Sequence, residues 1–111
     1  MLRASARATN DTIDFEVIIS DKAGDGGIPH GLMLTAFAEA VLGIDDAELV
    51  DARQRIRNEL GDAALVDAAA VIANYSALDR VADATGIPLE PEKEVNTVEL
   101  RARLGINDFA R

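Results

Sequence analysis

The side chains best suited to chemistry lie in one short stretch, residues 74–83, and at the single histidine of the chain. Asn74, Tyr75 and Arg80 bring an amide, a phenol and a guanidinium together on a predicted helix. With His30 they could line a small-molecule pocket between helices or between subunits, and these four residues form the candidate site. The simpler interpretation is structural: the polar stretch fixes helix packing through hydrogen bonds, and His30 lies where a helix begins.

Other catalytic and metal-binding arrangements find little support in the sequence. It contains no cysteine, which rules out disulfides, thiolate metal sites and cysteine nucleophiles. His30 has no second histidine at metal-binding spacing and no serine or cysteine beside it to form a dyad. Asp79 and Asp83 lie one helical turn apart, but acid–base catalysis needs two carboxyls with different pKa values in a cleft. We therefore expect no metal and no cofactor, and a protein that is not an enzyme of these kinds.

Composition indicates a small, acidic, globular protein. The chain has 111 residues, which suits one domain, and a formal net charge of −9. This charge disfavours nucleic acid and anionic membrane surfaces as partners, because both attract cationic proteins. No apolar run approaches the ~20 residues of a membrane span, so we expect no membrane partner and a cytoplasmic protein. Small aliphatic residues dominate the hydrophobic fraction and favour closely packed helices.

Two parts are expected along the chain. Residues 1–29 form an N-terminal arm and a glycine-rich loop, and residues 30–111 form a helical domain. Apolar and polar residues alternate from Ile13 to Ile19, which is the period of a short strand or an extended arm. The glycines at 24–27 match neither a Walker motif nor a dinucleotide fingerprint, so we interpret them as a flexible connection.

The first two predicted helices have clear boundaries. One spans Leu32 to Leu42. The next begins at Asp45, whose carboxylate is expected to cap it, and ends at Gly61. Ile44, just before the cap, could pack on Leu49 as a hydrophobic staple.

The third predicted helix begins with Asp62 as its cap, runs to about Ala84 and is stopped by Gly86. Residues 63–73 are apolar on almost every side, apart from Asp67. A helix that is apolar all round is normally buried all round, and one small chain offers too little to surround it. We therefore predict a homo-oligomer. The core candidates on this helix are Leu65, Val66, Ala69, Ile72, Ala73, Leu78, Val81 and Ala84.

A short final helix and a charged helix face complete the prediction. Residues 90–94 suggest an acidic linker, and Asn96 with Glu99 suggests the cap of a helix that runs through Leu104. The arginines of residues 53–57, with acidic neighbours, predict a solvated, salt-bridged face. The fold class is therefore all-α: a small bundle of three main helices plus a short C-terminal helix, with the N-terminal strand or arm beside it.

One part of the sequence resembles a known family. Residues 65–75 and 80–89, with Asn74, Arg80 and a closing Gly-Ile-Pro, resemble the C-terminal half of alkylhydroperoxidase D-like proteins in the carboxymuconolactone decarboxylase superfamily. The resemblance covers roughly residues 30–90 and implies an all-α fold that assembles as a homo-oligomer. Active peroxidases of this family carry Cys-x-x-Cys and a downstream histidine. Because this chain has no cysteine, no catalytic residue of the family carries over to it.

Three functions follow as hypotheses. The first is a catalytically degenerate, self-associating, alkylhydroperoxidase-like helical protein. The second is a small-molecule enzyme or binder of the carboxymuconolactone decarboxylase kind, with a cysteine-independent site built from His30, Asn74, Tyr75 or Arg80. The third is an accessory subunit of a hetero-complex, whose partner chain supplies what this chain lacks.

Overall fold

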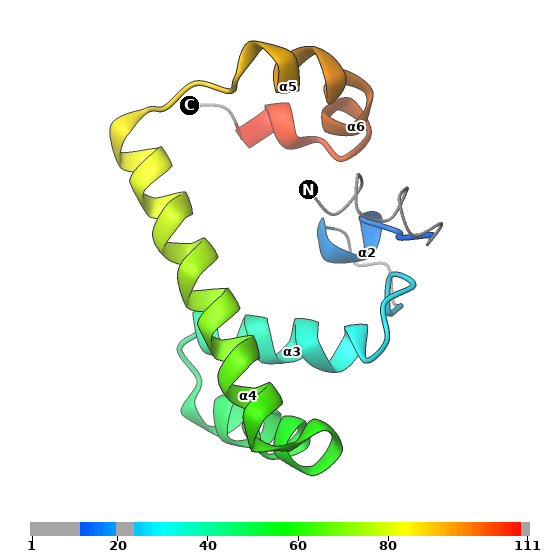
Figure 1. The fold of residues 1–111 in the computed structure, drawn as a ribbon, viewed down its shortest axis with the longest axis vertical. Coiled ribbons are helices and arrows are strands. Elements are labelled where there is room, and N and C mark those ends of the chain that lie inside the picture. Colours follow the sequence, from blue (N-terminus) through cyan, green and yellow to red (C-terminus); the bar gives the residue numbers. More distant parts are fainter. Residues whose placement is uncertain (1–11, 20–23, 110–111) are drawn as a thin grey trace.

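The computed structural model describes residues 12–19 and 24–109 of the chain, and this part is all-α, as predicted. Two helices dominate it and lie across one another (Figure 1). Four shorter elements precede and follow them. The elements are α2 (Glu16–Ile19), α3 (Gly31–Leu42), α4 (Asp46–Thr85), α5 (Pro91–Asn96), α6 (Val98–Arg103) and the 3₁₀ helix η1 (Ile106–Phe109).

One small hydrophobic core holds α3 against the first half of α4. Its buried side chains, among the residues that the structure describes, are Phe37 and Ala40 from α3 and Ala52 and Ile56 from α4. Ile56 is fully enclosed, with none of its surface exposed. Half-buried side chains from the second half of α4, among them Ile72, pack against the edge of this core. The core therefore binds α4 to α3 on one side only.

The start of α4 is formed as predicted, except for its apolar contact. Asp45 Oδ1 accepts hydrogen bonds from the N–H groups of Ala47 at 2.8 Å and Glu48 at 3.3 Å, which satisfies two otherwise unpaired donors. The predicted hydrophobic staple is wrong, because Ile44 is 103% exposed. Gly43 is extended there, with φ −79° and ψ −171°, and the connection carries Ile44 into solvent.

Gly61 breaks α4 into two halves, which are the second and third predicted helices. Its φ of 89° and ψ of 171° lie outside the helical region and in one that is essentially restricted to glycine. The cap predicted at Asp62 does not form; instead its carboxylate accepts a hydrogen bond from Arg57 Nε at 2.7 Å. The predicted end at Gly86 is correct. Gly86 is left-handed, and its N–H and that of Ile87 both donate to the Ala82 carbonyl oxygen.

The strand predicted from Ile13 to Ile19 is wrong, because this segment contains the single helical turn α2. Asp14 Oδ1 accepts a hydrogen bond from the Glu16 N–H at 3.0 Å, and such a side-chain bond favours a turn over an extended chain. The Asp14 N–H donates in turn to the Gly26 carbonyl oxygen at 2.9 Å, so the segment is tied to the glycine loop. A Cβ at Gly27 would overlap the Thr12 carbonyl oxygen, which explains the glycine there.

The predicted acidic linker at residues 90–94 is also wrong, because most of it belongs to α5. Pro91 occupies the first helical turn, where its missing N–H costs nothing. Asn96 ends α5 and does not cap the next helix, and the Thr97 hydroxyl donates to the Lys93 carbonyl oxygen at 2.7 Å. Arg101 then ties α6 back to α5 through its hydrogen bond to the Glu94 carbonyl oxygen.

Truncation of the core should be costly because so few side chains form it. We expect Ile56→Ala to lower the free energy of unfolding by about 2–5 kcal/mol, through lost burial and the cavity left behind. Urea unfolding followed by circular dichroism, at one fixed protein concentration, measures this loss. Val50→Ala, on the exposed side of the same helical segment, is the control and should change the value by less than about 0.5 kcal/mol. Equal losses in the two variants would contradict the assigned core.

The two glycines of α4 should respond differently to asparagine. Asparagine tolerates the left-handed conformation of Gly86 but not the φ and ψ of Gly61, although neither site has an atom within 4 Å of an added Cβ. We expect Gly61→Asn to cost about 1–3 kcal/mol in the same urea assay, and Gly86→Asn clearly less. A larger loss at Gly86 would argue against the break at Gly61.

Candidate functional site

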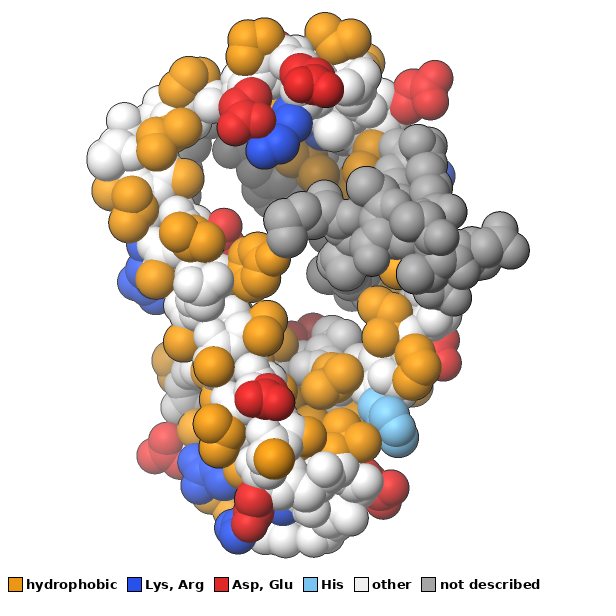
Figure 2. Space-filling model, viewed as in Figure 1, with side chains coloured by type: hydrophobic (Ala, Val, Ile, Leu, Met, Phe, Trp, Pro, Cys, Tyr) orange, Lys and Arg blue, Asp and Glu red, His pale blue; other side chains and the backbone are white. Residues whose placement is uncertain are grey.

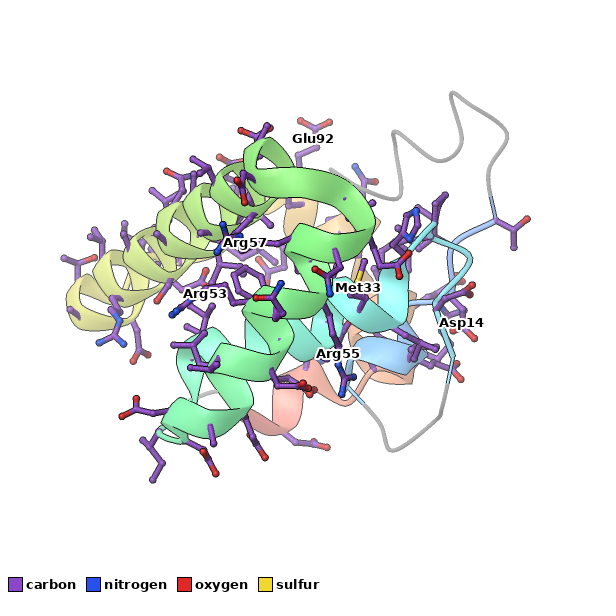
Figure 3. All side chains as sticks on the ribbon, turned by 90° about the horizontal axis from the view of Figure 1, so that it is seen from below. Asp14, Met33, Arg53, Arg55, Arg57 and Glu92 are labelled. Atoms are coloured by element: carbon purple, nitrogen blue, oxygen red, sulfur yellow. The ribbon has the colours of Figure 1, made fainter. Side chains whose placement is uncertain are left out.

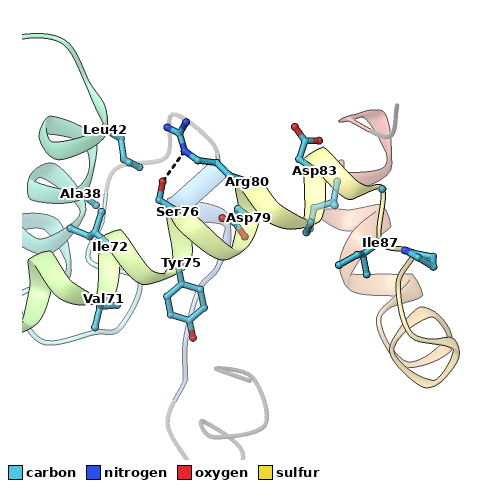
Figure 4. Close-up of a pocket in the computed structure, with 14 residues that line it drawn as sticks. Ala38, Leu42, Val71, Ile72, Tyr75, Ser76, Asp79, Arg80, Asp83 and Ile87 are labelled. Atoms are coloured by element: carbon cyan, nitrogen blue, oxygen red, sulfur yellow. Dashed lines mark hydrogen bonds between the residues drawn. The ribbon is translucent and has the colours of Figure 1, made fainter.

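The polar stretch of the sequence lies along the second half of α4, beyond the point where α3 ends. An open groove of about 1490 Å³ runs beside it, and Leu42 of α3 and Ile106 of η1 also contribute to its walls. Figure 4 shows this groove and the α4 side chains that face it. The polar α4 residues that line the groove are Tyr75, Ser76, Asp79, Arg80 and Asp83.

The structure places two of the four candidate residues in this groove and two outside it. Tyr75 and Arg80 line it, whereas His30 and Asn74 do not. His30 is the residue before α3, with a left-handed φ of 59°, and its side chain makes no capping bond. It lies at a helix start, as the structural interpretation predicted (Figure 2). The four side chains do not converge on one point.

The two candidates in the groove do not form a binding constellation either. Tyr75 and Arg80 leave α4 on different sides of the helix (Figure 4). Arg80 Nε lies 3.5 Å from Ser76 Oγ, which is a long hydrogen bond, and Tyr75 is 51% exposed. Within one chain this polar stretch does not fix helix packing, because Asn74, Tyr75 and Arg80 are all exposed to solvent.

The groups needed for acid–base or metal chemistry are not assembled in the described part of the chain. Asp79 and Asp83 both lie in solvent, without the enclosed cleft that separates the pKa values of catalytic carboxyls. Among residues 12–19 and 24–109, no cluster of three or more histidine, aspartate or glutamate side chains could hold a metal ion. In those same ranges, no helix is long and apolar enough to cross a bilayer.

The predicted arginine face on the first half of α4 is confirmed. Arg53, Arg55 and Arg57 project from this segment (Figure 3). Arg55 pairs with Asp51 at 2.6 Å, and Arg57 pairs with Asp62 at 2.7 Å, all with exposed side chains. Pairs of this kind stabilise a helix surface only slightly, and this face is solvated.

The feature that stands out on α4 is an exposed apolar surface, which we call the outer face. It lies opposite the side that packs on α3, and its residues recur at the three- and four-residue spacing of one helix face. Val66 and Val81 were predicted to be core residues, but they are 66% and 56% exposed. The outer face consists of Val66, Ala70, Ala73, Ala77, Val81 and Ala84, with Leu78 along one edge.

Val66, Ala73, Leu78, Val81 and Ala84 were predicted to be core residues, because hydrophobic spacing alone does not show which of two apolar faces meets the partner helix. Ala70 and Ala77 were not among the predicted core residues. In α4 the apolar faces are opposite one another, and α3 covers only that of Ala69 and Ile72. The groove side of the second half therefore carries both polar residues and the apolar Val71, Ile72 and Ala82, whereas the outer face turns apolar side chains to solvent. No protein-family model, curated protein or solved structure matches this chain.

If the polar stretch does not fix helix packing within one chain, its truncation should leave the fold intact. We expect Arg80→Ala to change the free energy of unfolding by less than about 0.5 kcal/mol, since an exposed side chain with one long hydrogen bond contributes little. Urea unfolding measures this value, with Ile56→Ala as the reference for a damaging change. A loss above about 2 kcal/mol would restore the predicted role of Arg80 in helix packing.

Proposed function

We propose that the protein is a catalytically degenerate, self-associating helical protein, and that the outer face of α4 is its contact surface. Its role is to assemble with further copies of itself and not to catalyse a reaction as a single subunit. The observation that carries this proposal is the size of the surface that one chain leaves exposed.

One chain exposes far more surface than a folded protein of its mass. Its accessible surface is 8684 Å², whereas about 5900 Å² is usual for a monomer of this size. Its radius of gyration is 15.6 Å, against about 13 Å for a compact domain. The difference of roughly 2800 Å² is more than the ~800 Å² that each partner buries in an interface of standard size. A chain of this shape needs a partner to cover it.

The exposed surface has the composition of an interface. Apolar side chains follow the whole second half of α4 (Figure 2). Monomeric proteins expose single hydrophobic residues freely but seldom a continuous apolar face along a long helix. Residues 68–78 contain no charged side chain at all, and depletion of charge marks the centre of interfaces.

The family resemblance supports the same proposal from the sequence. It rests on the third predicted helix, which is now the second half of α4, and alkylhydroperoxidase-like proteins assemble as homo-oligomers through an all-α fold. The missing cysteines separate this chain from peroxidase chemistry, so the part of the resemblance that carries over is assembly.

The groove supports a second candidate, the binding of a small molecule. Tyr75 and Arg80 line it and could hold an aromatic or anionic group. Its volume of about 1490 Å³ exceeds the ~300–1000 Å³ of most ligand pockets, and its polar residues are solvated. These features fit a macromolecular surface better than a small ligand, so we place this candidate second.

The solution mass across a dilution series tests self-association. Light scattering should give a stable multimer of the 11.8 kDa chain, and Val81→Lys should shift it toward monomer, because burial of an ammonium group is costly. Val50→Lys is the matched control: it changes a valine of similar exposure in the first half of α4 and should leave the mass unchanged.

Circular dichroism of both variants guards against simple unfolding. A wild-type chain that is monomeric at every concentration would overturn the proposal and favour the accessory-subunit hypothesis. Equal dissociation by the two lysine variants would place the contact elsewhere on the chain.

A further inference from the structure

We infer that Gly61 is a hinge at which α4 can straighten, so that two copies of the chain exchange the second halves of their α4 helices. Bent at Gly61, α4 closes on the core of its own chain; straightened, it carries its second half to the core of a second copy. This goes beyond the proposed self-association, because it needs no contact through the outer face. It is argued from the contacts of the second half, the conformation of Gly61 and the composition of α4.

The surface that is exchanged is one that the chain already buries in part. Half-buried side chains of the second half pack against the core at the three- and four-residue spacing of one helix face: Leu65, Ala68, Ala69 and Ile72. They reach the core of α3 and the first half of α4 from across the break in the helix. The second half of another copy presents the same side chains, so a second copy is the partner that fits this surface.

A single residue separates the two halves of α4, which run in different directions from the break (Figure 1). Connections between packed helices usually have about two to eight residues, whereas Gly61 is the one non-helical residue here. Its φ of 89° and ψ of 171° are open to glycine and to few other residues. A short connection under strain favours exchange between chains, because the open form relieves the strain and keeps the helix contacts.

Little else in α4 opposes a straight helix. Between Asp46 and Thr85 there is no proline and no second glycine. The expected cap of the second half, Asp62, instead binds Arg57 through an exposed ion pair. This pair belongs to the bent form, because residues five positions apart do not face one another on a continuous helix. An exposed pair contributes little, so it opposes opening only slightly.

The hinge leaves room for the exchange. A continuous α4 of 40 residues would be about 60 Å long, more than the 42 Å longest dimension of the chain, so its second half extends beyond its own core. In a symmetrical exchange two such helices cross at their hinges, where each copy contributes the same residue. Nothing lies within 4 Å of a Cβ added at Gly61, so a small residue there leaves the crossing open.

Gly61→Ala tests the hinge, because alanine disfavours the bent conformation and is the best helix former. The variant is combined with Val81→Lys, which places a charge on the outer face, and Val81→Lys alone is the reference. We expect the double variant to form dimers of the 11.8 kDa chain at roughly 100-fold lower concentration than the reference, about tenfold for each of the two strained residues. Light scattering over a dilution series measures this shift.

Gly86→Ala in the same Val81→Lys background is the matched control. Gly86 also has a positive φ and free space around an added Cβ, but it lies at the end of α4 and not at the break. The mass of this control should stay that of the reference at every concentration.

The distance between two positions on α4 shows whether the helix is straight. Spin labels at Asp46→Cys and Asp79→Cys, both exposed, should lie about 50 Å apart in the Gly61→Ala dimer and clearly closer in the reference. The chain has no cysteine of its own, so only these positions are labelled. An excess of the same variant without labels removes distances between copies.

Three results would each overturn the hinge: a folded double variant that stays monomeric, a dimer with the short label distance, or a double variant that has lost its helix by circular dichroism. Dimers of the Gly86→Ala control at the same concentration would also overturn it, because the effect would not come from the break. These outcomes are separate from those of the proposed function. A wild-type chain that is monomeric at every concentration overturns self-association through the outer face but not the hinge, which the double variant decides.

Discussion

The packing of Phe37 and Ile56 in one small core is the constraint on which the rest of this structure depends. This core joins α3 to the first half of α4, and the bend at Gly61 then returns the second half of the helix across its edge. Four buried side chains, in the part of the chain that the structure describes, are few for a protein of this length. No other side chain of the described residues is buried, so the question for this protein is what covers the rest of α4.

Because the small core covers only one side of α4, the second half of this helix has an exposed apolar surface and no enclosed catalytic site. Its residues nearest to α3, such as Ile72, are half-buried, and the polar residues further along turn into a groove too open to enclose a reacting group. The outer face carries small and branched apolar residues. A catalytic site needs converging polar groups in a desolvated cleft, whereas an interface needs a continuous uncharged face, and α4 provides the second of these.

Sequence features that act within one helical turn predicted the helices of this fold well, but they did not predict how the helices pack against one another. Asp45 and Gly86 were identified correctly because a cap and a left-handed glycine act within one turn of the chain. The alternation from Ile13 to Ile19 predicted a strand where a helical turn forms. The hydrogen bond of the Asp14 side chain favours this turn, and the hydrophobic pattern contains no information about that bond. The prediction of a linker at residues 90–94 is wrong, because proline breaks a helix in its interior but is favourable in the first turn, where Pro91 lies.

The candidate site could be predicted only in part, for a similar reason. Tyr75 and Arg80 share a groove because they are near neighbours on one helix, which sequence does show. His30 is a candidate only as the single histidine of the chain, and residue spacing does not show whether the start of one helix lies near the far end of another.

The distribution of charge along the chain also favours self-association over a catalytic role. A chain with a net charge of −9 repels its own copies, so association requires a contact from which charge is removed. The ion pairs of Arg55 and Arg57 lie on the first half of α4, and the charged residues Asp79, Arg80 and Asp83 follow residue 78. Between them, residues 68–78 form an uncharged stretch, flanked by charges of both signs. Solubility and self-association are therefore compatible in one helix, because the charges that keep the protein dissolved lie outside the face that would pair.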